Sequence, residues 1–176
     1  QSMIGLVHVQ SGKDGKPFKV QPQMVDFVGG MFLGIAIMGA LYHKANTGKG
    51  QRVTTSLIEG LSAMMVTFYM MNFFGRQVQP GLQSRNPMMF PSQSFKCKDG
   101  YFSTVATPNH WGRICQALGK PEWINDVDLS NVRYRVENYD KMEALVEEIT
   151  ITKNAAEWEE IFREHQVAFS KINTIT

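Results

Sequence analysis

The carboxylate of Asp26 is the side chain best placed to do chemistry in this sequence. It stands at the head of a long apolar segment, 24–43, and the glycines Gly29 and Gly30 follow it closely. A carboxylate in apolar surroundings costs free energy unless it is compensated, and the free amides at the start of a helix supply that compensation. Glycines let a substrate approach the backbone. Asp26 therefore either acts on a bound substrate or only caps the helix, a structural role that contributes about 1 kcal/mol.

No other set of side chains has the spacing of a known catalytic or ligand-binding motif. No Ser-His-Asp order is present. The histidines are scattered over different predicted elements: His8, His43, His110 and His165. Cys97 and Cys115 lack the spacing of zinc ligands, so we expect reduced thiols in a core. The stretch 48–50, Gly-Lys-Gly, is too short for a phosphate-binding loop and follows a helix. The sequence therefore predicts no metal site and no tightly bound cofactor.

The composition is that of an ordinary globular protein without a strong charge bias. The 176 residues carry 18 Lys and Arg against 16 Asp and Glu, which gives a formal net charge of +2. Because no basic face or run stands out, nucleic acid is not an expected partner. A chain of this length makes one domain, or one domain and part of another. We expect a cytoplasmic enzyme.

Two apolar helices dominate the first half of the chain. The first spans 24–43, and the following Gly-Lys-Gly stretch at 48–50 supplies a left-handed C-cap. The second spans 57–74. Ser56 caps it, and Glu59, three residues later, completes a capping box.

The second half begins after an irregular stretch. Residues 75–92 lack periodicity and are interpreted as a linker or an active-site loop. A hairpin follows, in which Asp99 and Gly100 form the turn between strands at 95–98 and 101–106. The remaining predicted elements are three helices and a returning strand, at 108–118, 137–149, 155–165 and 167–172.

The two apolar helices also fit a transmembrane hairpin, because basic residues lie between them. These residues are Lys44, Lys49 and Arg52. However, only about sixteen residues separate Asp26 from His43, whereas crossing a bilayer needs about 20. The second helix also carries Glu59 and Asn72. We therefore favour core helices and expect no membrane partner.

Four stretches together resemble one enzyme family. They are Val25-Asp26-Phe27-Val28-Gly29-Gly30, then 47–53 with 56–60, then 95–101, and finally Trp111 with 118–123. In this order over most of the chain, they resemble the family III CoA-transferases, the group that includes formyl-CoA and carnitine CoA transferases. The resemblance implies an α/β fold, with part of a Rossmann-like large domain plus a small α+β domain.

The resemblance also implies a role for Asp26. The family's nucleophilic aspartate precedes the same glycine-containing helix, and Asp26 matches it. In the family this carboxylate attacks a donor acyl-CoA, which gives a mixed anhydride and then an aspartyl-CoA thioester, before CoA leaves on a second acid. The implied partners are an acyl-CoA and a carboxylic acid. The implied substrate-binding residues are Gly29, Gly30, Asn86, Met88 and Met89.

The sequence departs from the family pattern at two places. Thr54, in a short β-prone stretch at 51–55, stands where the family usually has an aspartate. The loop 86–89 replaces a glycine run that closes over the site in formyl-CoA transferase, which favours an acid larger or less polar than oxalate. The same fold hosts α-methylacyl-CoA racemases, which carry a glutamate near the position of Thr107. Racemase or isomerase activity is the alternative, and a membrane hairpin or interaction module is a more remote one.

The resemblance assigns four parts to the chain. They are a large-domain segment with the catalytic Asp at 1–74, a linker or active-site loop at 75–92, a small α+β domain at 93–164, and a return to the large domain at 165–176. The family's amino-terminal part, which supplies most CoA contacts, and its carboxyl-terminal segment lie outside this sequence. We expect an interlocked homodimer at full length and no transferase activity from this piece alone.

Overall fold

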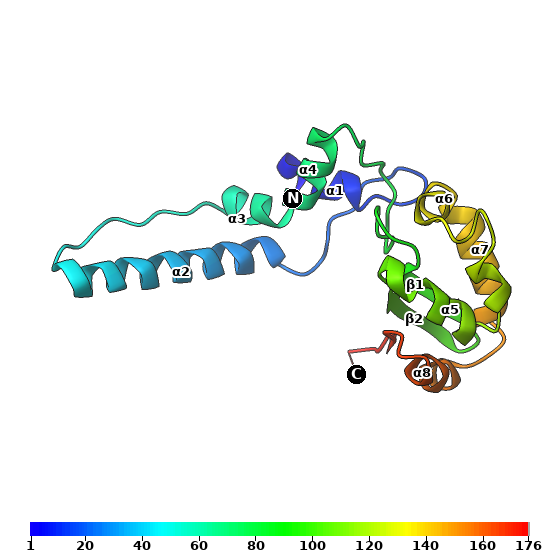
Figure 1. Ribbon diagram of the computed structural model, residues 1–176. Coiled ribbons are helices and arrows are strands. Elements are labelled where there is room, and N and C mark those ends of the chain that lie inside the picture. The colour runs from blue at the N-terminus through cyan, green and yellow to red at the C-terminus, as the bar shows by residue number, and fades with distance from the viewer. Residues whose placement is uncertain (176) are drawn as a thin grey trace. The chain divides into compact units, whose positions relative to one another are not determined.

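The computed structural model describes residues 1–175, and the chain divides into two units, Gln1–Gln83 and Ser84–Thr176 (Figure 1). Each unit is described by itself below. The boundary between them falls inside the irregular stretch 75–92. The described part of the first unit is built from helices, and the second combines helices with a three-stranded sheet.

The first unit contains one long helix and several short ones. Its elements are η1 Ser2–Ile4, α1 Leu6–Val9, α2 Met24–Thr47, α3 Leu57–Met64 and α4 Val66–Phe73. A small core joins the first two elements to α3 and the residue after it. Its buried members are Ile4, Leu6, Val9, Leu61 and Met65.

Helix α2 confirms the first predicted apolar helix and continues four residues beyond it, to Thr47. Gly48 ends the helix in the left-handed conformation, at φ 71°, and its N–H donates to the carbonyl oxygen of Lys44. An 18-residue window of α2 has a mean hydropathy of 1.9, yet only 6% of it is buried. By length and composition α2 could cross a membrane, so the sequence-based argument that this segment is too short is wrong. The core helix of a soluble protein meets the same criterion.

The second predicted apolar helix is two helices, α3 and α4, that meet at Met65. Ser56 caps α3 as predicted: its Oγ accepts from the N–H of Glu59 at 3.2 Å and donates to the Glu59 carboxylate at 2.9 Å. The β-prone stretch 51–55 forms no strand in the described residues. A strand needs a neighbour to pair with, and the described part of this unit offers none.

The second unit is organised on an antiparallel sheet of order β1-β2-β3. Its strands are β1 Ser92–Cys97, β2 Gly100–Val105 and β3 Ser170–Lys171. Cys97 pairs with Gly100, so the hairpin turn is made by Lys98 and Asp99, one residue earlier than predicted. Gly100 begins β2 at φ 151°, a conformation that favours glycine.

Helices complete the second unit around one face of this sheet. They are η2 Pro108–His110, α5 Trp111–Ala117, η3 Pro121–Ile124, α6 Val132–Glu137, α7 Tyr139–Thr150 and α8 Ala155–Glu164. The predicted helix at 137–149 corresponds to α7, and α8 begins where predicted. The core between the sheet and the helices is rich in aromatic rings, with Phe95, Phe102, Trp158 and Phe162 all at most 2% exposed.

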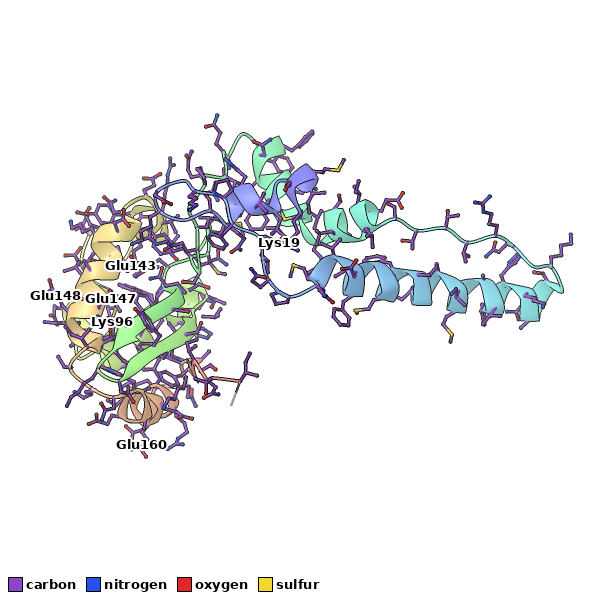
Figure 2. All side chains as sticks on the ribbon, turned by 180° about the vertical axis from the view of Figure 1, so that it is seen from behind. Lys19, Lys96, Glu143, Glu147, Glu148 and Glu160 are labelled. Atoms are coloured by element: carbon purple, nitrogen blue, oxygen red, sulfur yellow. The ribbon has the colours of Figure 1, made fainter. Side chains whose placement is uncertain are left out.

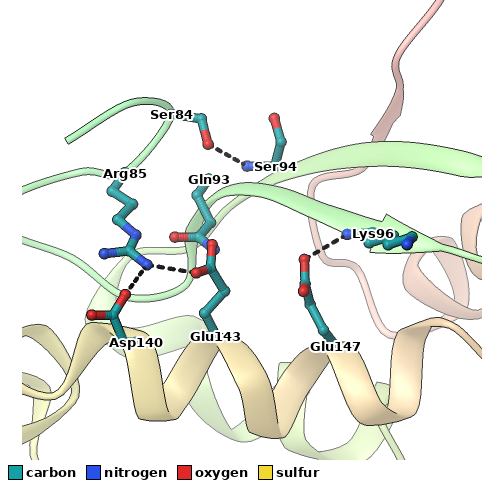
Figure 3. A network of polar contacts seen from close by, with 8 residues as sticks. All are labelled: Ser84, Arg85, Gln93, Ser94, Lys96, Asp140, Glu143 and Glu147. Carbon is teal, nitrogen blue, oxygen red and sulfur yellow. Dashed lines mark hydrogen bonds and ion pairs between the residues drawn. The ribbon is translucent and has the colours of Figure 1, made fainter. Parts of the chain in front are cut away.

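The outer edge of β1 is bonded along its length to groups outside the sheet. The Lys96 N–H donates to the Glu147 carboxylate at 3.0 Å (Figure 3). The Lys96 carbonyl accepts from the Thr150 hydroxyl at 2.6 Å. Ser94 N–H donates to Ser84 Oγ at 3.3 Å. Further bonds at the two ends of the strand join Asn86 to Ser92 and Lys98 to Lys153. Helix α7 and the chain just before β1 therefore take the place of a further strand.

Candidate functional site

Asp26 lies in the first turn of α2, inside the helix. The residue before the helix is Gln23, and its side chain makes no capping hydrogen bond. Interpretation of Asp26 as the helix cap is therefore wrong. Its side chain is exposed, and the positive end of the helix dipole stabilises a negative charge in this turn. The Asp26 carboxylate is thus exposed and does not serve as the cap of α2.

Two hollows of the first unit meet at Asp26. One, of about 380 Å³, is lined by Gln1, Ser2, Val7, Lys19, Gln23, Val25 and Asp26. The other, of about 420 Å³, is lined by Gln23, Asp26, Phe27, Gly30 and Met31. The first is lined by Lys19, which Figure 2 labels, and by two glutamines. The second is mainly apolar. The carboxylate therefore borders both a surface suited to anionic groups and one suited to a hydrocarbon chain.

The two glycines after Asp26 have different surroundings. Gly29 is buried, and a Cβ added to it would lie 2.5 Å from Cδ2 of Leu57 at the start of α3. Gly60 of α3 lies against the same place, where an added Cβ would be 3.3 Å from Val28 and 3.6 Å from the Gly29 Cα. Gly30 is exposed, has nothing within 4 Å of an added Cβ, and lines the apolar hollow. Close helix packing accounts for Gly29, whereas Gly30 has no packing partner; the substrate-binding role of each stays a prediction.

The other predicted substrate residues lie in the second unit, in the loop before β1. Asn86 is half-buried, and its Oδ1 accepts from the N–H of Met88 at 2.8 Å, which makes a local turn. Met88 is 42% exposed. The carbonyl of Met89 accepts from the Tyr139 hydroxyl at 3.3 Å. The loop thus presents the Met88 side chain while its backbone is held; its role toward a substrate also stays a prediction.

Several residues around these sites were not predicted from the sequence. Lys19 and Gln23 lie in an irregular segment before α2, where no periodicity marks them. Phe27 and Met31 are four residues apart, so the helical spacing of 24–43 places them on one face, beside Gly30. That pattern could have identified the apolar hollow.

The cysteines are buried core thiols, as predicted. Cys97 and Cys115 are both unpaired, and burial raises the pKa of each thiol, that of Cys115 to about 12. Neither is therefore placed for nucleophilic chemistry at neutral pH. In residues 1–175, no group of three or more His, Cys, Asp or Glu side chains is arranged to hold a metal ion.

Comparison with known proteins places these features in one family. A family model for CoA-transferase family III matches residues 1–176. An acyl-CoA transferase of Fusarium pseudograminearum is 31% identical over 97% of this chain and 38% of its own length. The succinyl-CoA:glutarate CoA-transferase of Mus musculus is 26% identical over 99% of this chain and 40% of its own.

A solved structure supports the same fold. The crystal structure of Rv3272 from Mycobacterium tuberculosis superposes with a TM-score of 0.82 at 24% identity, over 99% of this chain and 45% of that one. The chain thus spans about two fifths of the length of the curated relatives it matches. The match over its whole length means that this chain belongs to CoA-transferase family III.

Proposed function

We propose that the complete protein moves CoA between carboxylic acids, with Asp26 as the nucleophile. The observation that carries this proposal is the position of Asp26: an exposed carboxylate in the first turn of α2, bordering both hollows. The family match over residues 1–176 supports the reaction class. The names of the relatives support it too, since the mouse protein is named for CoA transfer between succinate and glutarate.

In the proposed reaction Asp26 exchanges acyl partners in four steps. A carboxylate oxygen attacks the thioester carbonyl of the donor; the C–S bond breaks, CoA thiolate leaves, and a mixed anhydride remains. The thiolate then attacks the Asp26 carbonyl carbon, which releases the donor acid and gives an aspartyl-CoA thioester. Together, the four steps replace one difficult exchange by a series of easier acyl transfers.

The second half of the reaction runs these two steps in reverse, with the acceptor acid in place of the donor acid. Its carboxylate attacks the aspartyl thioester, forms a second anhydride and expels CoA thiolate. Attack of the thiolate on the acceptor carbonyl gives the new acyl-CoA and restores the Asp26 carboxylate. No net proton is gained or lost, so a carboxylate alone can serve as the covalent catalyst.

The two hollows suggest how the acids bind beside Asp26. Lys19 lines the same hollow as Asp26, so its positive charge can attract an anionic substrate group. Phe27 and Met31 provide apolar contact for a chain that passes Gly30. We propose an acceptor with a hydrocarbon portion larger or less polar than that of oxalate.

We propose that the rest of the complete protein completes the site by covering α2. Large apolar side chains of α2 are exposed here, among them Phe27, Met31, Ile35 and Met38 at 66–70%. Since the chain covers about two fifths of its relatives, we propose that the absent large-domain segments cover this face, in an interlocked homodimer. We accordingly expect no transferase activity from residues 1–176 alone.

Covalent trapping on the complete protein tests the proposal. The wild type is incubated with a panel of acyl-CoAs, treated with hydroxylamine and mapped by peptide mass spectrometry. A hydroxamate on the peptide that holds Asp26 is expected. Asp26→Asn should lose the adduct and lower transfer by roughly three orders of magnitude or more. An Asn variant with unchanged turnover would refute the assignment, and α-proton exchange without any adduct would instead support racemase chemistry.

A further inference from the structure

Lys19 carries a positive charge at the hollow of about 380 Å³ that Asp26 also lines. It is the one basic side chain among the described residues around this hollow. Within residues 1–175, neither Lys19 nor Asp26 makes an ion pair. Lys19 is therefore not engaged by the nucleophile, and its charge can act on an anion that enters the hollow.

The backbone next to Lys19 is held by one side-chain amide, that of Gln1. Its Nε2 donates to the Val20 carbonyl at 3.1 Å, and its Oε1 accepts from the Val20 N–H at 2.9 Å. An amide is suited to this pairing because it carries a donor and an acceptor side by side. Within the described part of the chain, these two are the only hydrogen bonds that residues 17–21 make. The position of Lys19 therefore depends on Gln1.

Gln1 is itself held by the small core of the first unit, because it directly precedes η1. Ile4 of η1 is buried in that core, and its carbonyl accepts from the Tyr69 hydroxyl of α4 at 3.0 Å. Val20 packs against the same core. Gln1 also lines the hollow. The core thus fixes Gln1, and Gln1 fixes the backbone beside Lys19.

The anion that Lys19 can reach is one carried by the acid. During transfer the reacting carbonyl group must lie at Asp26, and Lys19 lines the same hollow. In CoA the whole pantetheine arm separates the thioester sulfur from the nearest phosphate, so the phosphates lie outside the hollow while the thioester is at Asp26. In a diacid only a short hydrocarbon chain separates the two carboxylates, and a hollow of this size can hold both.

We propose that Gln1 is a positioning residue for Lys19, and that Lys19 selects acids with a second carboxylate. The inference rests on the proposed function, in which Asp26 exchanges acyl groups. It assigns the hollow to dicarboxylic acids, because a carboxylate leaves water at a lower cost where a cation faces it. A lysine on a mobile segment would first have to be ordered, whereas one whose backbone is already held loses less entropy when the anion binds.

The test compares variants of the complete enzyme at both residues. Lys19→Gln removes the charge, and Lys19→Arg keeps it. Gln1→Met has a side chain of similar size that makes neither bond to Val20. Lys16→Gln and Gln21→Met are the matched controls, since Lys16 and Gln21 are exposed in the same segment and are not among the described residues that line the hollow.

Each variant is assayed with pairs of acceptor acids of equal length. Succinate is paired with butyrate and glutarate with valerate, so that the members of a pair differ only at the end far from the reacting carboxylate. The donor is the acyl-CoA that gives the strongest Asp26 adduct in the trapping experiment. Steady-state kinetics are measured beside hydrogen exchange of residues 18–21, and the Asp26 adduct is measured in every variant.

We expect the wild type to prefer the diacid of each pair. Lys19→Gln and Gln1→Met should each lower the ratio of kcat/KM for the diacid to kcat/KM for the monoacid about tenfold, mainly through KM, because a contact to a charged group is lost. Lys19→Arg should keep most of the preference.

Hydrogen exchange separates the two roles. Exchange of residues 18–21 should quicken in Gln1→Met and stay as in the wild type in Lys19→Gln. Gln1→Met combined with Lys19→Gln should change the acid preference little more than either change alone, because both act through one charge. Lys16→Gln and Gln21→Met should match the wild type in acid preference and in exchange.

Three results would overturn the inference. An equal rise of KM for both members of each pair in Lys19→Gln would mean that Lys19 acts on the reacting carboxylate. Unchanged exchange in Gln1→Met would mean that Gln1 does not hold the segment. A wild type without a preference for the diacids would overturn the assignment of the hollow.

Failure of the proposed function gives a different result. In each of the three cases above the adduct at Asp26 persists, whereas its absence from the wild type would overturn the proposed function itself. If Gln1→Met does not fold, Gln1→Asn gives the same comparison, since it keeps the amide on a side chain that is one methylene shorter.

Discussion

The two glycines that follow Asp26 differ in their surroundings: Gly29 is packed against α3, and Gly30 is open. Gly29 lies where α2 and α3 cross, and Gly30 lies one position further, on the side that borders the apolar hollow. A motif of two adjacent glycines thus contains one position fixed by packing and one that is open. Because only Gly30 has open space, it can be substituted without a clash in this structure, and its contribution to access can be measured.

We predict that Gly30→Ala lowers the activity of the complete enzyme while stabilising α2. Alanine is favoured over glycine inside a helix by about 1 kcal/mol, and an added methyl group would narrow the approach to Asp26. Gly34→Ala is the control, since Gly34 also has nothing within 4 Å of an added Cβ but does not line the hollow. Thermal unfolding and kcat/KM are compared. Equal activity of the two variants would contradict a role for Gly30 in access.

The buried thiol of Cys115 makes stability depend on alkaline pH. Burial raises the pKa of Cys115 from its ordinary 9.0 to about 12. Between these values the folded chain keeps a proton that the unfolded chain releases. The stability gained by burying the neutral thiol is therefore present in full below about pH 9 and is lost as pH rises toward 12.

We accordingly expect the urea midpoint to fall between pH 9 and pH 12, and to fall less in Cys115→Ala. Peptide mapping after iodoacetamide treatment at pH 8.5 should find Cys115 unmodified in the native chain and modified in urea. Rapid alkylation of the native chain at this site would contradict the prediction.

At the scale of elements, the hairpin turn is joined to the start of α8. Oδ1 of Asp99 accepts from the Ala155 N–H at 2.8 Å, so a turn residue caps a helix 56 positions away. That bond is the main cause that lowers the pKa of Asp99. A lowered carboxyl pKa gives stability above the ordinary value of 3.8 and loses it as pH falls through the folded pKa.

We predict that Asp99→Ala lowers the melting temperature of the second unit more than Asp99→Asn, which keeps an acceptor oxygen. Asp99→Asn should also lose less stability than the wild type on acidification below about pH 4. All three tryptophans, Trp111, Trp123 and Trp158, lie in the second unit, so their fluorescence follows its unfolding. Equal melting temperatures for the two variants would exclude the cap.

The elements that could be predicted from the sequence are those whose start or end is determined by neighbouring residues. Helix α2 followed from its apolar run and Gly48, and the start of α3 followed from Ser56 and Glu59. The break at Met65 was missed, because no glycine or proline stands within four residues of it. The stretch 51–55 failed as a strand because pairing is not encoded in the strand itself.

The residues of the candidate site also differ in whether a local sequence pattern identifies them. Asp26 and the glycines could be singled out from a local pattern, which the family resemblance then made specific. Lys19 could not, because it acquires its place through tertiary structure, in the hollow that it shares with Asp26.

At the scale of the whole molecule, the two units differ in how much apolar surface they expose. Five large side chains follow one another along α2 at spacings of three or four residues: Phe27, Met31, Ile35, Met38 and Tyr42. A continuous apolar stripe of this kind marks a surface that is normally covered. The core of the second unit, by contrast, encloses its largest aromatic side chains.

We predict that residues 1–176 self-associate and that residues 84–176 stay monomeric. Sedimentation velocity from 1 to 100 μM should give oligomers for the longer chain and a single small species for the shorter one. Replacement of Met31, Ile35 and Met38 by serine should reduce the association. A monomeric longer chain would contradict the interpretation of α2 as a surface that needs a cover.

The bonds along the outer edge of β1 bear on what such oligomers become. An open strand edge is a template on which further chains can add in register, and growth of that kind leads to fibres. Here Glu147, Thr150 and Ser84 already occupy the donors and acceptors that an incoming strand would use. Chains that associate through α2 therefore cannot grow into cross-β fibres by adding strands at the edge of β1. Their oligomers should dissociate once α2 is covered.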